Sequence, residues 1–118
     1  MIKRILLYTT ENGKCPVQDF LDTLSEKVFK KIIWVINLVT ELKSPPKTYF
    51  KKLINTDDIW ECRIQLGSNS YRIFCFFDNN ELIILTHGLV KKTQKTPPQE
   101  IEKAEKYKND YFRRKNDD

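Results

Sequence analysis

Residues 59–97 read IWECRIQLGSNSYRIFCFFDNNELIILTHGLVKKTQKTP, and this stretch decides the fold. It contains three strand-like segments, 59–66, 71–77 and 82–90, separated by polar turns. The first segment alternates apolar and polar side chains, as expected of a strand with one buried face. The other two are largely apolar on both faces, as expected of strands inside a sheet. The pattern therefore predicts an antiparallel meander.

Before the meander, the sequence predicts one strand and two helices. Residues 3–10 form a β-rich run that ends in a turn containing glycine. Apolar residues then recur at helical spacing after Pro16, which can occupy the first position of a helix. Ser25 can cap a second, longer helix. The buried face of this helix is predicted to contain Phe29, Ile32, Ile33, Ile36 and Val39.

The remaining segments complete an α+β pattern. Residues 49–54 are short and basic, as expected of an edge strand or an extended loop. In the run Thr-Pro-Pro-Gln at 96–99, the Thr96 hydroxyl is predicted to cap a helix by accepting from the Gln99 amide. The polar tail at 113–118 is predicted to be frayed. The order β-α-α, meander, α predicts a single α+β domain spanning residues 1–118.

Composition limits the class of protein. The chain has 118 residues and a formal net charge of +5, which favours an anionic partner such as nucleic acid or an acidic protein. Its three cysteines are odd in number and lack CxxC spacing, so neither a zinc site nor disulfides are expected, and Cys62 and Cys75 are predicted to be buried thiols in a reducing cytosol. We find no membrane-spanning apolar run and no signal-peptide pattern, and therefore expect a cytoplasmic protein.

Basic residues are the strongest candidates for chemistry. Arg63 and Arg72 lie within apolar strands, where an unpaired charge is costly. Three lysines follow the last strand: Lys91, Lys92 and Lys95. Guanidinium groups can hold a phosphate through two hydrogen bonds and stabilise charge in a phosphoryl transition state. Whether the two arginines share a surface depends on strand register. The alternative is a solvated basic rim with one structural pair, Arg63 with Glu61.

Other polar and aromatic residues have competing interpretations. Asp57 and Asp58 adjoin in a turn, where solvated residues are favoured over a metal site, so neither a metal nor a cofactor is predicted. His87 lies in an apolar strand, where a satisfied core or edge histidine is favoured over a catalytic one. Tyr71 either stacks on a base or is a buried strand tyrosine.

The segments WECRIQLGSNSYRIFCFFD (60–78) and LIILTHGLVKKTQKTPPQEIEKA (82–104) resemble the RelE/ParE toxin superfamily, most closely its HigB-like, phage-derived Gp49-like branch. The most specific elements are the strand Glu61-Cys62-Arg63, the Tyr71-Arg72 pair and the run 87–97. The resemblance covers nearly the whole chain. It implies a RelE-like fold: a small twisted, mainly antiparallel sheet with two N-terminal helices packed on one face and a C-terminal helix.

The resemblance also implies a function. Members on the RelE side enter the ribosomal A site and cut mRNA, and a helix-turn-helix antitoxin encoded by the adjacent gene typically neutralises them. The expected activity is that of a type II toxin, a metal-independent and ribosome-dependent mRNA endoribonuclease. Its products would be a 2′,3′-cyclic or 3′-phosphate and a 5′-hydroxyl. The expected partners are this antitoxin and the ribosome with bound mRNA, without a membrane or a small-molecule cofactor. A ParE-like toxin that binds gyrase without chemistry and a degenerate toxin that only binds its antitoxin remain alternatives.

Residue roles carry over from the family motif by motif. Arg72 falls where the family grips the scissile phosphate, and Arg63 falls at a basic strand position used for phosphate contact or as a base. The lysines after the last strand are expected to hold RNA backbone or to protonate the leaving oxygen. Catalytic roles are thus expected for Arg63, Arg72, Lys92 and Lys95. RNA contacts are expected for Lys52, Gln65, Tyr71, His87 and Lys91. Gln65 stands where relatives often carry a second basic residue, and residues 91–99 contain no tyrosine, so a lysine-assisted mechanism is expected.

Overall fold

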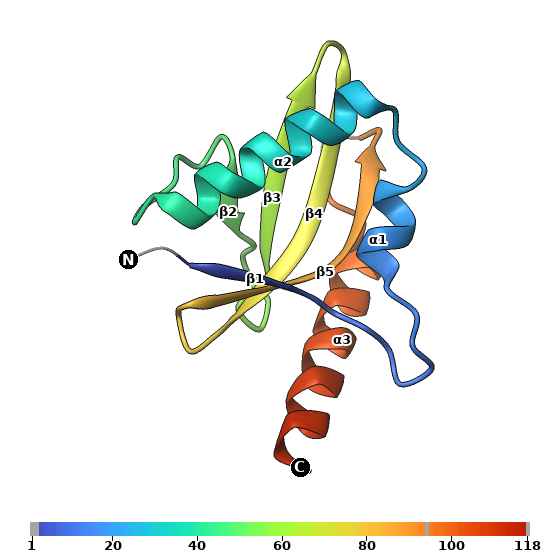
Figure 1. Cartoon of the computed structure of the whole chain (residues 1–118), viewed down its shortest axis with the longest axis vertical. Coiled ribbons are helices and arrows are strands. Elements are labelled where there is room, and N and C mark those ends of the chain that lie inside the picture. Colours follow the sequence, from blue (N-terminus) through green and yellow to red (C-terminus); the bar gives the residue numbers. More distant parts are fainter. Residues whose placement is uncertain (1–2, 94, 118) are drawn as a thin grey trace.

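A computed structural model describes residues 3–93 and 95–117. Within them, the chain forms a five-stranded sheet with helices on both faces (Figure 1). The elements follow in the order β1 Arg4–Leu7, α1 Pro16–Leu21, α2 Glu26–Glu41, β2 Phe50–Lys52, β3 Trp60–Leu66, β4 Asn69–Asp78, β5 Leu82–Lys91 and α3 Pro98–Asn116. This order confirms the predicted α+β architecture.

The sheet has the strand order β1-β5-β4-β3-β2. Strands β2 to β5 form the predicted antiparallel meander, with β4 at the centre. A two-residue turn at Gly67 and Ser68 joins β3 to β4, and Gly67 adopts a φ of +62°, which favours glycine. Strand β1 lies parallel to β5, with Arg4 opposite Leu82, so the sheet is mixed but mainly antiparallel.

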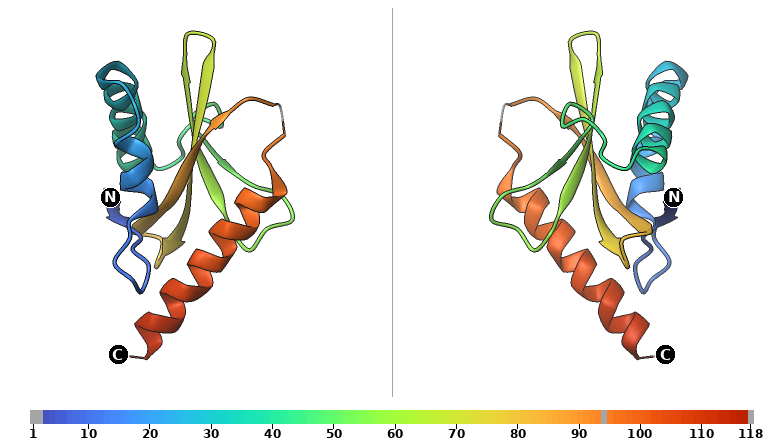
Figure 2. Two further views of the ribbon diagram at one scale, coloured as in Figure 1. Left: turned by 90° about the vertical axis from the view of Figure 1, so that its right-hand side faces the viewer. Right: turned by 90° about the vertical axis from the view of Figure 1, so that its left-hand side faces the viewer.

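The sheet separates two apolar layers. Figure 2 shows α1 and α2 on one face of the sheet and α3 on the opposite face. Alternate residues of β4 contribute to each layer: Ile73 and Cys75 pack with α1 and α2, whereas Phe74 and Phe76 pack with α3. This alternation follows directly from the two-residue repeat of a strand. The prediction of two N-terminal helices on one face is confirmed.

Helix α2 begins as predicted but is rotated relative to the predicted buried face. The Ser25 hydroxyl accepts a hydrogen bond from the Val28 amide at 3.3 Å, which confirms the cap. Val28 and Val35 are buried, whereas Phe29 is 38% exposed and Ile33 is half-buried. Both sets of residues satisfy helical spacing, and only the contact with the sheet selects which edge of the apolar stripe is covered.

A β-bulge interrupts the pairing of β4 with β5. Phe74 pairs with His87 while Cys75 pairs with Leu85, which leaves Thr86 as an extra residue. The Thr86 hydroxyl donates to the Phe74 carbonyl at 3.1 Å. Strict alternation would place Leu85 and His87 on the same face of the sheet. The bulge instead turns His87 toward α3, where its ring stacks on Phe74.

The start of α3 differs from the predicted cap. The helix begins at Pro98, and Pro97 occupies the capping position without a side-chain hydrogen bond. The Thr96 hydroxyl donates instead to the Glu61 carboxylate at 3.3 Å, so the cap prediction is wrong. The buried Glu61 carboxylate competes successfully for the Thr96 hydroxyl. Loss of a hydrogen-bond donor to this buried carboxylate would cost more free energy than the loss of a cap at the exposed start of a helix.

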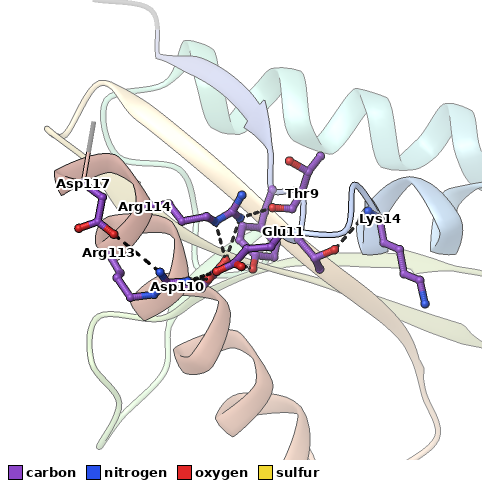
Figure 3. A network of polar contacts seen from close by, with 9 residues as sticks. Thr9, Glu11, Lys14, Asp110, Arg113, Arg114 and Asp117 are labelled. Atoms are coloured by element: carbon purple, nitrogen blue, oxygen red, sulfur yellow. Dashed lines mark hydrogen bonds and ion pairs between the residues drawn. The ribbon is translucent and has the colours of Figure 1, made fainter.

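The predicted frayed tail is helical through Asn116. Figure 3 shows the cluster that we call the C-terminal network, which comprises Glu11, Asp110, Arg113, Arg114, Asp117 and the Thr9 carbonyl. Arg113 and Arg114 contact the Asp110 carboxylate at 2.7 and 2.8 Å. Arg113 also pairs with Glu11, and Arg114 donates to the Thr9 carbonyl. These contacts attach the last turns of α3 to the loop after β1.

Candidate functional site

The register of β3 and β4 brings the two arginines together. Arg63 and Arg72 are direct partners across the two strands. Glu61 lies two residues before Arg63, Phe74 lies two residues after Arg72, and these two are also cross-strand partners. Residues two apart on a strand share a face and Phe74 packs in the α3 layer, so both arginines lie on the α3 face of the sheet. The register that the sequence left undetermined therefore places both guanidinium groups on one surface.

A buried carboxylate lies between the two guanidinium groups. Glu61 Oε1 is 3.6 Å from Arg63 Nε and 3.5 Å from Arg72 Nε. The Glu61 side chain is 3% exposed, the Arg72 side chain 9% and the Arg63 side chain 31%. The predicted pair of Arg63 with Glu61 is present, but Glu61 is shared with Arg72. The Thr96 hydroxyl contacts the other Glu61 oxygen and connects the site to the loop before α3.

Arg72 is only partly satisfied by the protein. Its Nη1 donates to the Tyr71 carbonyl at 3.2 Å. Its buried Nε lies within charge contact of Glu61 but makes no hydrogen bond, because distance alone does not provide the required geometry. Burial lowers the pKa of Arg72, Glu61 opposes this effect, and Arg63 adds to it. A guanidinium remains charged in proteins, so this group has donor capacity for a further anion.

Two adjoining hollows open over these arginines. We call the first, of about 430 Å³, the cationic hollow; it is lined by Arg63, Ser70, Arg72, Lys91, Lys92 and Thr93. The second hollow, of about 450 Å³, is lined by Lys47, Thr48, Arg63, Ile64, Gln65 and Arg72. Arg63 and Arg72 line both, so the hollows form one surface. Among the described residues, four cations and no carboxylate line the cationic hollow, which suits a phosphate-bearing ligand.

The three lysines after β5 have different environments. Lys91, the last residue of β5, lies opposite Ser70 and is half-buried. Burial lowers the pKa of Lys91, the Arg72 charge lowers it further, and Glu61 opposes these effects. Lys92 lines the same hollow but is exposed. Lys95 is exposed in the following loop and does not line the hollow. Lys91 and Lys92 therefore line the hollow and Lys95 does not, whereas the sequence left open which of the three lysines would protonate the leaving oxygen.

Two expected RNA contacts are buried away from the cationic hollow. Tyr71 is 7% exposed and packs in the layer of α1 and α2, on the opposite face from its neighbour Arg72. His87 is 4% exposed, and its ring nitrogens each lie 3.0 Å from a partner, Thr86 Oγ1 and Glu100 Oε2. Burial lowers the pKa of His87 to about 4, although Glu100 opposes this effect. Both residues match the structural alternatives rather than direct contact with RNA.

The other expected contacts lie at the edge of the site. Gln65 lines the second hollow, and its side-chain amide donates to the Gly67 carbonyl at 3.0 Å. Lys52 lines neither hollow and pairs with Asp58 at 2.7 Å. Its neighbour Lys51 is the cross-strand partner of Glu61, and the Lys51 charge helps to lower the pKa of Lys91. Strand alternation combined with the register of β2 against β3 places Lys51, and not Lys52, on the same face of the sheet as Glu61 and the two arginines.

Across residues 3–93 and 95–117, no group of three or more His, Cys, Asp or Glu residues could hold a metal ion. None of the described helices is long and apolar enough to cross a membrane.

The chain matches a known protein family over most of its length. The sequence model of the family described as phage derived protein Gp49-like (DUF891) matches residues 19–109. The matched region extends from α1 into α3 and includes every residue that lines the two hollows. No curated protein matches the chain.

Proposed function

The chain belongs to the phage-derived Gp49-like family of RelE/HigB-type toxins, and on this basis we propose that it is an mRNA endoribonuclease that acts with the ribosome. The observation that carries the proposal is the cationic hollow. Four cations converge there, and one of them, Arg72, is a buried arginine whose counter-charge, Glu61, is shared with Arg63. Such a site stabilises negative charge that increases on a phosphate during reaction.

The chemistry follows from the distribution of charge. The RNA 2′-hydroxyl attacks the adjacent phosphorus, and the bond from phosphorus to the 5′-oxygen breaks. The products are a 2′,3′-cyclic phosphate, which water can open to a 3′-phosphate, and a 5′-hydroxyl. Negative charge accumulates on the phosphorane oxygens in the transition state. Arg72 stabilises this charge from within the sheet, while the more exposed Arg63 holds the entering phosphate.

The departing 5′-oxygen requires a proton. Lys91 lines the hollow with both arginines, and its lowered pKa makes the ammonium a better donor than an ordinary lysine. Lys92 lines the same hollow and contributes charge toward the RNA backbone. The 2′-hydroxyl proton passes to solvent water in this scheme, and Glu61 positions the arginines without accepting a proton from the substrate.

Transcript mapping tests the proposal. Expression of the chain is induced, and cellular transcript 5′ ends are mapped alongside the rate of protein synthesis. We expect translation to stop and new 5′-hydroxyl ends to appear inside translated frames. Arg72→Ala is the matched control, because its transcripts should remain intact. Intact mRNA with gyrase-linked DNA breaks would identify a ParE-like toxin instead, and normal growth would indicate a degenerate one.

A toxin of this family implies an antitoxin partner. We infer that the partner is a small helix-turn-helix protein encoded by the adjacent gene. The net charge of +5 favours acidic segments in such a partner. Co-expression of the two proteins followed by affinity purification should recover a complex. Recovery of the chain alone, with growth unaffected by deletion of the neighbouring gene, would contradict this inference.

A further inference from the structure

A groove of about 390 Å³ lies where the end of α2 approaches the edge strand β2. Its floor is aromatic and consists of Phe50, Trp60 and Phe77. Phe50 and Trp60 stack with ring centroids 4.7 Å apart, and Phe77 meets Trp60 edge-on at 5.6 Å. All three rings belong to the layer of α1 and α2, so the floor of the groove lies on the opposite face of the sheet from the cationic hollow, while Lys47 and Lys51 at its rim lie toward the hollows.

Lysines surround this aromatic floor. Five of them line the groove: Lys3, Lys43, Lys47, Lys51 and Lys52. Lys3 donates to the Leu42 carbonyl at the end of α2, and Lys52 pairs with Asp58. Within the described part of the chain, no ion pair joins the other three to a carboxylate. We call this feature the lysine-ringed groove. An apolar floor inside a ring of cations complements a ligand that carries an apolar group flanked by negative charges.

The groove suits a peptide better than an RNA base. Phe50 covers one face of the Trp60 ring, and Phe77 packs edge-on against it, so these rings do not form an open slot for a flat base. An RNA strand in the cationic hollow would also have to turn around strand β2 to reach the other face of the sheet. A single apolar side chain needs no such slot, and carboxylates on either side of it can reach the lysines.

We propose that the lysine-ringed groove binds an acidic, amphipathic segment of the antitoxin, with an apolar side chain on the aromatic floor and carboxylates against the lysines. The proposal rests on the proposed function for the identity of the partner. Lys47 lines both the groove and the second hollow beside Arg63. A bound acidic segment therefore also reduces the positive potential at one end of the RNA site. The antitoxin could then inhibit the toxin without contacting Arg72.

A binding assay with a synthetic peptide tests the groove directly. The probe is a labelled peptide with one leucine flanked on both sides by glutamates, and the protein is the full chain with Trp34→Phe. The chain has two tryptophans, so Trp60 is then the only one. Binding is followed by fluorescence anisotropy at physiological salt and by the emission of Trp60. We expect saturable binding accompanied by a change in Trp60 emission.

Two charge reversals separate the groove from the cationic hollow. Lys43→Glu should weaken peptide binding about fivefold, because a carboxylate then faces the peptide's own carboxylates. Lys92→Glu makes the same charge change in the cationic hollow, which Lys92 lines without lining the groove, and should alter binding by about twofold or less. Replacing the leucine of the peptide with serine should remove the Trp60 signal, because the floor loses its apolar ligand.

Equal effects of Lys43→Glu and Lys92→Glu would overturn the proposal, as would undiminished binding of the serine peptide. Displacement of the peptide by a single-stranded RNA that changes Trp60 emission would assign the groove to RNA. The two proposals fail separately. If the chain binds the peptide but never cuts mRNA, the proposal for the groove stands and the endoribonuclease proposal fails. If it cuts mRNA but does not bind the peptide, only the proposal for the groove fails.

Discussion

Arginines meet carboxylates in two regions of this molecule, and the two regions differ in balance. In the C-terminal network, Arg113 and Arg114 have Asp110 between them, and Glu11 and Asp117 also pair with Arg113. In the cationic hollow, two arginines and two lysines adjoin a single buried carboxylate, Glu61. The network is therefore close to neutral, while the hollow retains an excess of positive charge.

The pKa shifts of the arginines point in opposite directions. The pKa of Arg113 is raised, chiefly by its hydrogen bond to Glu11 and then by that to Asp110. The pKa of Arg72 is lowered, chiefly by burial. An arginine stabilised by its partners is a structural element, whereas one left partly unsatisfied under a hollow can still bind an anion. Pairing and burial together, rather than the number of basic residues, distinguish a binding surface from a structural one.

Alanine substitution of one arginine from each region should give the largest contrast. Arg72→Ala should slow mRNA cleavage about a hundredfold or more, a loss of about 3 kcal/mol, because its contact strengthens in the transition state. Arg114→Ala should leave cleavage within about twofold and lower stability by about 1 kcal/mol. Single-turnover cleavage and thermal unfolding are measured on both variants. A folded Arg72→Ala protein that cuts at the parental rate would exclude the proposed site.

Neutralising the carboxylates tests which region supports the fold more strongly. Glu61→Gln leaves two close arginines without their shared counter-charge, and should lower the free energy of unfolding by about 2 to 3 kcal/mol. Asp110→Asn acts on a carboxylate that is 20% exposed and should cost about 1 kcal/mol. Urea denaturation of the two variants gives both values. Equal losses would show that the burial of Glu61 has no energetic consequence.

The pH dependence of cleavage tests Lys91. A donor must be protonated, so kcat should fall as pH rises through the lowered pKa of Lys91, at a lower pH than for an ordinary lysine. Lys91→Arg stays charged, which should move this fall to higher pH. Lys91→Ala should reduce kcat about tenfold, because Lys92 remains to supply part of the charge. Lys92→Arg is the matched control and should keep the parental profile. An unchanged profile in Lys91→Arg would exclude Lys91 as the donor.

Salt dependence should reveal the smallest difference. Lys92→Ala should weaken RNA binding a few-fold and reduce the slope of log affinity against log salt by about one, because one phosphate contact is lost. Arg113→Ala should leave the slope unchanged, since its charge is already paired. Titrations of a short single-stranded RNA at several salt concentrations measure both slopes. A reduced slope in Arg113→Ala would place the C-terminal network in contact with RNA.

Local periodicity was sufficient to predict the meander, whereas the shared face of the two arginines depended on a register that the sequence left open. Side chains alternate along β3 and β4, and a two-residue turn sets their register, so Arg63 and Arg72 needed no distant contact to be brought together. The same reasoning predicted the cap of α2 at Ser25, because that hydrogen bond joins residues only three apart.

Contacts between distant segments could not be predicted in this way. The sequence offered the Thr96 hydroxyl a nearby partner, the Gln99 amide in the first turn of α3. Only the folded sheet brings the Glu61 carboxylate within reach of this hydroxyl. The bulge at Thr86 reverses the alternation of β5, so that His87 faces α3. The half-burial of Lys91 likewise depends on its neighbours across the sheet. These features arise from tertiary packing, which cannot be predicted from the pattern of residues that are neighbours in the sequence.

The parallel pairing of β1 with β5 has a consequence for the order of folding. Each meander pairing joins strands that are close in the chain, whereas β1 pairs with a strand centred almost eighty residues later, from Arg4 to Leu82. Closing so long a loop costs the most chain entropy, so we expect β1 to join the sheet after the meander has formed. The first strand to leave the ribosome is thus the last to be used. During synthesis the nascent chain carries an unpaired β1 until β5 has emerged. Lys91 ends β5 and Lys92 follows it directly, so the sheet can close only when the residues of the cationic hollow have also emerged.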